Sequence, residues 1–408
     1  MDCRIQEQGG REMKEGWEYI DFKDVFPVKM GKTPPRGDKS SWDANKETHN
    51  KWVSIADISN NEGKIIKDTK EYISDSAAEK INKVSKGSLL MSFKLSIGRM
   101  AFAGDDLYTN EAIIAIPENE KYILRFIYYY LLSYDWLSLT EGNEKVKGAT
   151  LNKTSIGKIQ LPVLSLSEQQ SIVDYLDSAF AKIDAMKANA EKALNDAKAL
   201  FQASLKEMLE PKEGWEEKAI KDFATDMYRG SGVKRDQVTE EGISCVRYGE
   251  IYTKYNFHFS KCASHTLTEY VNSPKYFEYG DILFAITGES VEEIGKSIAY
   301  TGKEKCIAGG DIVVMKHNYE PRYISYALST PSAIKQKGHG KTKLKVVHTN
   351  IPSLKEIILP IAPKDEQIKI SDTLDSLKSK VDRLQENYDK ISQECDALKQ
   401  AILRKVFE

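Results

Sequence analysis

Two short stretches combine glycine, lysine and threonine in the order found at the end of a phosphate-binding loop. Residues 31–33 and 340–342 both read Gly-Lys-Thr. A complete loop of this kind has another glycine five residues before the glycine of the Gly-Lys pair, so that backbone N–H groups can surround the phosphates. Those positions hold Phe26 and Lys335. We therefore interpret both stretches as glycine-containing loops with exposed lysines, and not as nucleotide sites.

Other patterns that would support chemistry on DNA are also missing. A methyltransferase acting on an amino group needs a glycine-rich cofactor loop and an Asn/Asp-Pro-Pro-aromatic motif, but Pro34-Pro35 is followed by Arg36. Asp281 and Asp311 lie near predicted strands without the clustered acids and lysine of a metal-dependent nuclease. The six histidines and five cysteines lack metal-ligand or disulfide spacing. The sequence therefore predicts no catalytic or metal site, with the cysteines as reduced thiols.

The strongest pattern is a repeat of nearly the whole chain. Residues 14–18 (Lys-Glu-Gly-Trp-Glu) recur at 212–216, an offset of 198 residues. At the same offset Leu-Pro recurs at 161–162 and 359–360, and Glu-Gln recurs at 168–169 and 366–367. In between, residues 86–90 align best with 279–283, an offset of 193. A repeat of this length indicates a duplicated domain with similar ends and a divergent middle.

The first part of each copy combines short strand-like runs with one apolar helix. The predicted strands are 52–58, 89–93 and 112–116 in the first copy, and 245–248, 281–286 and 311–315 in the second. The predicted helices are 122–133 and 323–329. Together these elements predict an α+β globule in each copy.

The second part of each copy is predicted to be one long helix. Ser167 and Asp365 occupy equivalent N-cap positions, and neither stretch contains glycine or proline until Pro211 or the chain end. Apolar residues spaced by three and four positions predict a coiled-coil seam. The residues assigned to helix pairing are Leu176, Ile183, Met186 and Leu200 in the first helix and Leu374, Val381, Leu384, Ile391 and Leu398 in the second.

We expect these two helices to pair with each other, antiparallel, because small residues of the first helix correspond to large ones of the second. A second apolar line of the first helix, Phe180, Leu194 and Phe201, leaves two interpretations open. It either docks a partner subunit or packs on the chain's own globules.

Composition is that of a globular protein with more than one domain. The chain has 408 residues, of which 41% are hydrophobic and 29% charged. No apolar segment is long enough for a membrane span, and the first residues lack the apolar stretch of a secretory signal, so we expect a cytoplasmic protein. The net charge of −2 is not the basic excess typical of a free-standing DNA-binding domain.

The duplicated plan resembles the specificity subunits of type I restriction–modification systems over essentially the whole chain. Gly-Trp at 16–17 and 214–215 opens each copy, and residues 31–34 resemble the family's Gly-x-Thr-Pro loop, which residues 229–232 (Arg-Gly-Ser-Gly) replace in the second copy. The strand starts at 86 and 280, the Leu-Pro pairs and the Glu-Gln pairs follow in the same order in both copies. The resemblance implies a leader at 1–14, target-recognition domains at 15–165 and 211–364, and long helices at 166–210 and 365–408.

The resemblance also implies a function and a set of partners. Each domain would read one half of a bipartite, asymmetric site in double-stranded DNA, while the helices set the spacing and dock two methylation subunits. Restriction subunits, which are motor endonucleases, would join for cleavage. The chain itself would be a non-catalytic recognition subunit without its own cofactor. S-adenosylmethionine, ATP and magnesium are expected on the partner subunits.

A subunit enclosed by partners need not supply all of the attraction for DNA, so its basic residues can be local. The predicted DNA-binding residues of the first domain are Lys32, Arg36, Lys39, Lys145, Lys147 and Lys153. Those of the second are Arg229, Lys234, Arg235, Lys341, Lys343 and Lys345, beside Lys335 and Lys337. Thr150, Asn152, His348 and Asn350 are further candidates for contacts with bases.

Overall fold

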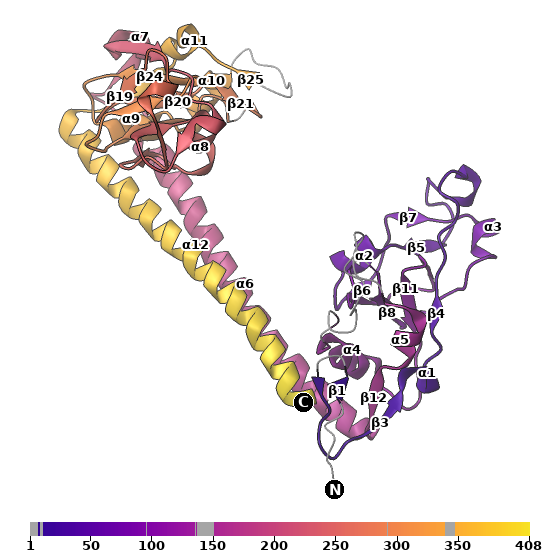
Figure 1. Cartoon of the computed structure of the whole chain (residues 1–408). Helices are drawn as coiled ribbons and strands as arrows, with labels where there is room; N and C mark the ends of the chain where they lie inside the picture. Colours follow the sequence, from indigo (N-terminus) through magenta and orange to yellow (C-terminus); the bar gives the residue numbers. More distant parts are fainter. Residues whose placement is uncertain are drawn as a thin grey trace. The chain divides into compact units, whose positions relative to one another are not determined.

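The computed structural model describes residues 7–8, 11–94, 96–134, 136, 151–291, 293–338 and 347–408. The chain forms two compact units: unit 1 is Met1–Asn189 with Asp389–Glu408, and unit 2 is Ala190–Tyr388. The two long helices belong to both units. Helix α6 (Leu166–Met208) begins in unit 1 and ends in unit 2, whereas α12 (Lys364–Phe407) begins in unit 2 and ends in unit 1 (Figure 1).

Unit 1 contains an α+β globule built around a five-stranded sheet in the order β4-β11-β8-β9-β6. Its strands are β4 (Lys29–Met30), β11 (Ile113–Ile116), β8 (Leu89–Ser92), β9 (Met100–Ala103) and β6 (Ile65–Ile66). A three-stranded sheet, β10-β5-β7, contains β10 (Tyr108–Thr109), β5 (Lys51–Val53) and β7 (Glu71–Tyr72). A two-stranded sheet pairs β3 (Glu18–Asp21) with β12 (Gln160–Val163), and another pairs β1 (Glu7–Gln8) with β2 (Arg11–Glu12). The helices are α1 (Phe22–Val25), α2 (Ile55–Asn60), α3 (Asp75–Ala78), α4 (Leu124–Leu132) and α5 (Lys153–Gly157).

Unit 2 repeats this plan with a five-stranded sheet in the order β14-β24-β20-β22-β17. Its strands are β14 (Asp226–Arg229), β24 (Ile312–Lys316), β20 (Ile282–Ala285), β22 (Ser297–Tyr300) and β17 (His258–Phe259). The second sheet contains β15 (Val238–Thr239), β18 (Ser264–Thr266), β16 (Ile243–Val246), β23 (Cys306–Ala308) and β19 (Tyr276–Phe277). Two pairs complete the strands: β13 (Glu216–Ala219) with β26 (Ile358–Ile361), and β21 (Thr287–Gly288) with β25 (Val347–His348). The helices are α7 (Ile220–Phe223), α8 (Tyr248–Thr253), α9 (Pro321–Ala327), α10 (Pro331–Gly338) and α11 (Ile351–Lys355).

The five-stranded sheets of the two units have the same topology, which confirms the duplicated α+β fold. In both, the edge strand β4 or β14 runs antiparallel to its neighbour, and the opposite edge strand β6 or β17 runs parallel to its neighbour. The predicted strand 52–58 is the main error. The chain leaves β5 at Val53 because Ser54 caps α2, accepting from Asp57 N (3.3 Å) and donating its own N–H to the Asp57 carboxylate (2.8 Å).

The core of each globule includes the start of one long helix and the end of the other. In unit 1, Leu176 of α6 and Leu403 and Phe407 of α12 lie in the same apolar cluster. In unit 2, Leu374 of α12 and Leu205 of α6 do the same. The long helices are therefore integral parts of both globules.

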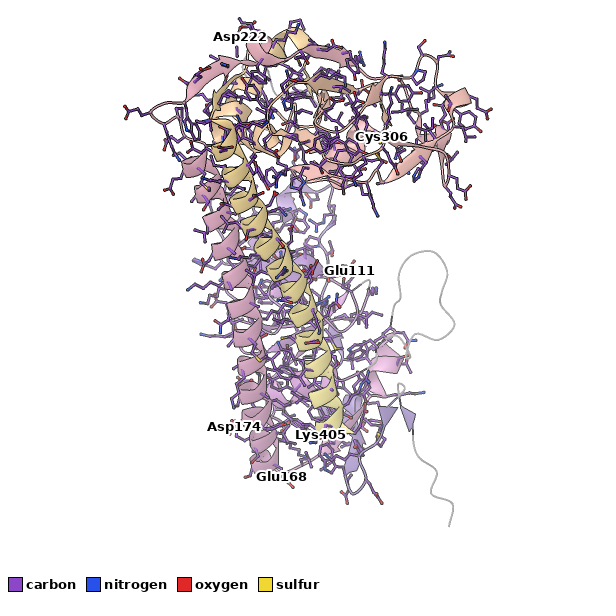
Figure 2. All side chains as sticks on the ribbon, turned by 90° about the vertical axis from the view of Figure 1, so that its left-hand side faces the viewer. Glu111, Glu168, Asp174, Asp222, Cys306 and Lys405 are labelled. Carbon is purple, nitrogen blue, oxygen red and sulfur yellow. The ribbon has the colours of Figure 1, made fainter. Side chains whose placement is uncertain are left out.

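Contacts within each unit show that α6 and α12 run antiparallel, as predicted. In unit 1, Lys187 pairs with Asp396 (3.4 Å), while Asp184, three residues earlier on α6, pairs with Lys399, three residues later on α12. In unit 2, Lys198 donates to Gln385 (2.8 Å). Figure 2 shows the same orientation, with Glu168 near the start of α6 and Lys405 near the end of α12 at one end of the helix pair.

Two columns of apolar residues were predicted to form the seam of α6. The column through Leu176 and Ile183 is buried as predicted, whereas the column through Met186 and Leu200 is displaced by one residue. Leu176, Ile183, Leu374 and Val381 are buried, and Leu384 and Ile391 are half-buried. Met186, Leu200 and Leu398 are 59%, 59% and 48% exposed. The buried column of α6 instead contains Phe180, Leu194 and Phe201. Each of these follows by one residue a position of the predicted column, which runs through 179, 186, 193 and 200.

The apolar line that sequence left open therefore packs within the chain. Phe180 contacts the ring of Tyr129 (5.4 Å between centroids) and lies under the Lys399 ammonium (5.1 Å). Phe201 contacts Phe257 at 5.5 Å. A residue shift of one position rotates a helix face by about 100°, so the predicted column lies outside the packed face.

The N-caps also differ from those predicted. Helix α6 begins two residues earlier than predicted, with a capping box in which Ser165 Oγ accepts from Glu168 N (3.3 Å) and Ser165 N donates to Glu168 (2.9 Å). Helix α12 begins at Lys364, so Asp365 lies inside its first turn, where a negative charge is favourable.

Among the described residues, no helix is both long enough and apolar enough to cross a membrane.

Candidate nucleic-acid interface

The loop that follows β4 in unit 1 crosses tightly over the segment between β10 and β11. Gly31 N donates to Ile113 O (3.3 Å) and Lys32 N to Thr109 O (2.8 Å). A Cβ atom on Gly31 would lie 2.0 Å from Thr109 O, so no other residue fits there. The crossing fixes where residues 31–41 leave the sheet.

The same crossing recurs in unit 2, after β14. Gly230 N donates to Ile312 O and Ser231 N to Ala308 O, both at 2.8 Å. A Cβ atom on Gly230 would lie 2.2 Å from Gly309 O. The predicted correspondence between residues 31–34 and 229–232 thus has a structural basis: each loop needs a glycine where it passes over another backbone.

Lysines and one arginine with unpaired charges lie in these two loops. Lys32 and Lys39 in unit 1, and Lys234 and Arg235 in unit 2, are exposed. Within the described part of the chain none of the four forms an ion pair, so their charges are available to an external anion. Lys153, the first residue of α5, is exposed in the same way.

Two other arginines, Arg36 in the first loop and Arg229 at the end of β14, are held by neighbouring groups. The guanidinium of Arg36 pairs with Glu71 (Nη2 to Oε2, 3.2 Å) and packs over the rings of Trp42 and Trp52 at 4.2 and 4.9 Å. Arg229 pairs with Asp311 at 2.6 Å. Exposed ion pairs of this kind contribute only about 0–1 kcal/mol, so a phosphate or a base edge can compete for either guanidinium.

Two acidic side chains that the sequence analysis did not assign to DNA face these loops. Glu111 accepts a hydrogen bond from Thr33, and Figure 2 shows it on the globule of unit 1. Although burial acts to raise its pKa, this hydrogen bond keeps the pKa of Glu111 below its ordinary value. Asp311 occupies a similar place beside Arg229. Carboxylates accept from the N4 amino group of cytosine in the major groove, so both can contribute to base reading.

Some predicted residues are elsewhere. Lys145, Lys147, Lys341, Lys343 and Lys345, like Thr150, lie outside the described residues. Lys337 is buried, and its Nζ donates to Ser297 Oγ at 3.1 Å, so it is not part of a DNA-binding surface.

Asn152 and Asn350 prove to be equivalent helix caps. Asn152 Oδ1 accepts from Ser155 N (2.8 Å) at the start of α5, and Asn350 Oδ1 accepts from Ser353 N (2.9 Å) at the start of α11. Their side chains are used by the backbone, which explains their recurrence without any contact with a base. His348 lies beside Thr287, with 3.2 Å between Nδ1 and Oγ1.

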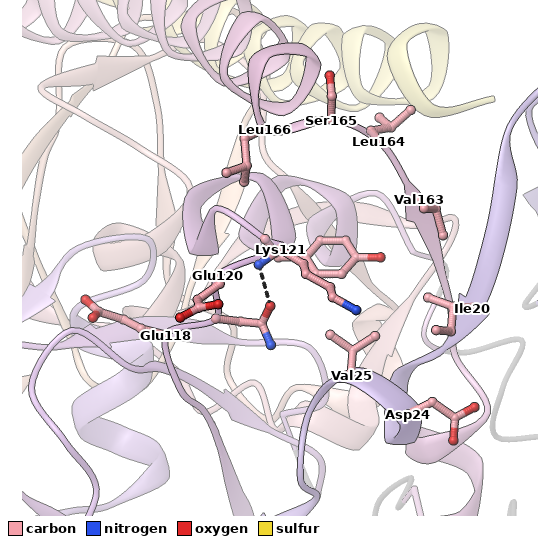
Figure 3. Close-up of a pocket in the computed structure, with 12 residues that line it drawn as sticks. Ile20, Asp24, Val25, Glu118, Glu120, Lys121, Val163, Leu164, Ser165 and Leu166 are labelled. Atoms are coloured by element: carbon pink, nitrogen blue, oxygen red, sulfur yellow. Dashed lines mark hydrogen bonds between the residues drawn. The ribbon is translucent and has the colours of Figure 1, made fainter.

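A groove of about 700 Å³ in unit 1 has the wrong charge for a phosphate. Its lining carries three acidic residues, Asp24, Glu118 and Glu120, against one lysine, Lys121, around apolar residues such as Val163 and Leu166 (Figure 3). Anionic DNA would be repelled there. Among the described residues there is also no group of three or more histidine, cysteine or acidic side chains placed to bind a metal ion.

Comparison with known proteins identifies the repeated unit. The family model for the type I restriction modification DNA specificity domain matches twice, at residues 14–195 and 212–393. The type I restriction enzyme MjaIX specificity subunit of Methanocaldococcus jannaschii is 23% identical over 171 residues, which span 40% of this chain and 38% of that protein.

Two solved structures share the fold over almost the full chain. One comes from a study of complex assembly and conformational transition of the type I R-M system, with a TM-score of 0.71, 16% identity, and coverage of 97% of this chain and 99% of that one. The HsdS subunit from Thermoanaerobacter tengcongensis gives a TM-score of 0.55 at 18% identity, covering 98% of each chain. Since the family model covers most of the sequence, the chain belongs to the type I restriction–modification DNA specificity family and carries two copies of its specificity domain.

Proposed function

We propose that each globule reads one half of a split, asymmetric site in double-stranded DNA and that α6 and α12 set the distance between the halves. The observation that carries this proposal is the loop crossing found in both units. The same sheet and the same glycine hold the two loops, yet the residues after the glycine differ: Lys-Thr-Pro in unit 1 and Ser-Gly-Val in unit 2. One scaffold with two different loops suits two different half-sites.

Within each half-site, some residues bind the phosphates through their charge and others read the bases through hydrogen bonds. Lys32, Lys39, Lys234 and Arg235 contact phosphates, which position the protein without reading sequence. The guanidinium groups of Arg36 and Arg229 are suited to guanine, because a fork of donors matches its O6 and N7. Lys153 adds a phosphate contact from α5.

The partners are two methylation subunits and restriction subunits, with S-adenosylmethionine, ATP and magnesium bound to them and not to this chain. The net charge of −2 supports shared binding of the duplex, since the chain alone offers only local positive charge. The full-length fold similarity to a chain from a study of type I R-M complex assembly supports the same arrangement.

The direct test exchanges one domain. Residues 15–165 are replaced by the corresponding domain of a relative, the chain is coexpressed with its methylation subunit, and methylated motifs are mapped in the cellular DNA. We expect one half-site to change while the other half-site and the gap stay the same.

A binding experiment provides the second arm. The purified complex should bind a bipartite duplex less tightly as salt rises, and Lys32→Gln or Lys234→Gln should reduce the slope of log affinity against log salt by about one each. Loss of both half-sites on domain exchange, or binding that ignores salt, would contradict the proposal.

A further inference from the structure

The glutamine that follows each Glu at the start of the long helices is buried, and both its Oε1 and its Nε2 are hydrogen-bonded. In unit 1, Gln169 is 0% exposed. Its Oε1 accepts from Ile123 N (2.9 Å), and its Nε2 donates to Leu164 O (2.9 Å) and Lys121 O (2.8 Å). It therefore joins α6 to the backbone immediately before α4 and to the end of the β12 segment.

Gln367 makes the counterparts of two of these three bonds in unit 2. It is 1% exposed, its Oε1 accepts from Glu320 N (3.0 Å), and its Nε2 donates to Ala362 O (2.7 Å). Glu320 N lies immediately before α9, which corresponds to α4. Two different cores thus keep the same polar joint.

A second polar contact between helix and globule, or joint, lies eight residues further along each helix, at Asp177 in α6 and at Asp375 in α12. In unit 1, Asp177 Oδ1 accepts from Arg125 Nε (3.1 Å) and Nη2 (2.9 Å), and also from the Tyr129 hydroxyl. The Arg125 guanidinium packs over the Tyr129 ring at 4.9 Å. Arg125 and Tyr129 are one turn apart on α4, so both reach the same carboxylate.

The equivalent joint in unit 2 has the same chemistry with one addition. Asp375 accepts from Arg322 Nη1 (2.7 Å) and the Tyr326 hydroxyl (2.6 Å) of α9, and it also pairs with His258 Nε2 (2.8 Å). Although burial acts to raise it, the hydrogen bonds from His258, Tyr326 and Arg322 lower the pKa of Asp375 to about 2. This carboxylate is therefore ionised at neutral pH.

Two directional joints on one helix fix a globule more closely than apolar packing does. The apolar contacts around Leu176 and Leu374 resist separation, but they specify the register less sharply, because hydrophobic attraction has no direction. Hydrogen bonds to charged groups are both directional and strong. The two joints of each unit are about 12 Å apart along the helix at 1.5 Å per residue, so together they fix rotation and translation.

From this geometry we infer that Gln169 with Asp177, and Gln367 with Asp375, are positioning residues that fix the register of each recognition domain on its long helix and so the number of base pairs between the half-sites. The inference rests on the proposed function. A slide of one helical turn is about 5.4 Å, which exceeds the rise of about 3.4 Å per base pair. A domain that slips by one turn therefore reads a site whose gap differs by at least one base pair.

The test measures gap discrimination with the complete complex. Asp177→Asn and Asp375→Asn keep the shape of the side chain and remove its charge. Each variant, coexpressed with the methylation subunit, is assayed for methylation of duplexes whose gap equals that of the mapped site or is one base pair shorter or longer. We expect each variant to lose about tenfold of the wild-type discrimination between gaps, with the half-site sequences unchanged.

The matched control is Asp184→Asn, one heptad further along α6. Asp184 pairs with Lys399 of α12, and it forms no hydrogen bond or ion pair with the described residues of the globule. We expect this variant to keep wild-type discrimination, and Arg125→Lys to keep more of it than Arg125→Gln, because lysine preserves the charge without the fork.

The outcomes separate the two ideas. If Asp177→Asn and Asp375→Asn discriminate gaps as well as the wild type does, the inference is wrong, even when their thermal midpoints fall. If Asp184→Asn relaxes the gap equally, the effect belongs to the helix pair and the inference is also wrong. If the wild-type complex shows no bipartite preference, it is the proposed function that fails.

Discussion

Two lysines of α10 lie in opposite environments although only one residue separates them. Lys335 is exposed, whereas Lys337 is buried and donates to Ser297. Burial lowers the pKa of Lys337 to about 7. From sequence both were placed with the basic residues of the second domain, because a lysine before Gly-His-Gly suggests an exposed loop. In the tertiary structure the side chain of Lys337 is instead buried in the globule.

Replacing Lys337 should change how stability depends on pH. An unfolded lysine has a pKa of about 10.4, so between pH 7 and 10 the unfolded chain binds one more proton than the native chain. Native stability therefore rises with pH across this window. We expect Lys337→Met to raise the thermal midpoint at pH 7 and to flatten that rise. Thermal melts of the purified chain at pH 6 to 10 check this, with Lys335→Met as the control that should follow the wild type.

At the scale of elements, the long helices show how a heptad pattern can be read one residue out of phase. The column predicted from sequence contained Met186 and Leu200, but the packed column contains Phe180, Leu194 and Phe201. Lys187 also lies in the packed column and pairs with Asp396. Because a lysine interrupts this column, a search for regularly spaced apolar residues does not recognise it. The predicted column also contains Ala179 and Ala193, so it is apolar throughout and hydrophobicity alone favours it.

One substitution at two positions of α6 tests the corrected phase. Leu194 is 3% exposed and Leu200 is 59% exposed. We expect Leu194→Ala to lower the free energy of unfolding by about 2–5 kcal/mol, because it removes buried methyl groups and leaves a cavity. Leu200→Ala should change it by about 0.5 kcal/mol or less. Denaturant unfolding of both variants measures these changes. Equal losses of unfolding free energy at the two positions would contradict the corrected phase of the seam.

At the scale of the whole molecule, the chain is one scaffold used twice, and the long helices are built into both cores. The end of α12 enters unit 1 through Phe407, which contacts the rings of Trp17 (6.5 Å) and Tyr130 (5.4 Å). The end of α6 enters unit 2 through Leu205 and Leu209. Length added to the middle of both helices must therefore appear between the two globules.

Inserting one heptad in the middle of each helix should lengthen the gap of the recognised site. Seven residues add about 10 Å at 1.5 Å per residue, which corresponds to about three base pairs. A whole heptad keeps the packed face in register, so both half-sites should stay unchanged. Mapping methylated motifs in cells that carry the insertion checks the result. An unchanged gap, or altered half-sites, would contradict the spacer role.

The sequence by itself determined the duplication, the α+β character of each copy, the two long helices and their antiparallel pairing. These depend on local periodicity and on repeated motifs such as Gly-Trp, Leu-Pro and Glu-Gln, which are visible along the chain. The equivalence of the loops at 31–34 and 229–232 was predicted from the family resemblance, and the structure supplies its reason, a glycine at each backbone crossing.

Only the tertiary structure decided the phase of the helix seam, the burial of Lys337, the capping roles of Asn152 and Asn350, and the joints formed by Asp177 and Asp375. The two caps reach only three residues along the chain. The others depend on partners far apart in the chain, such as Arg125 with Asp177 and Arg322 with Asp375. A charged or amide side chain looks the same in sequence whether it faces water, DNA or a buried partner. The fold chooses among these surroundings, because polar groups removed from water must be paired.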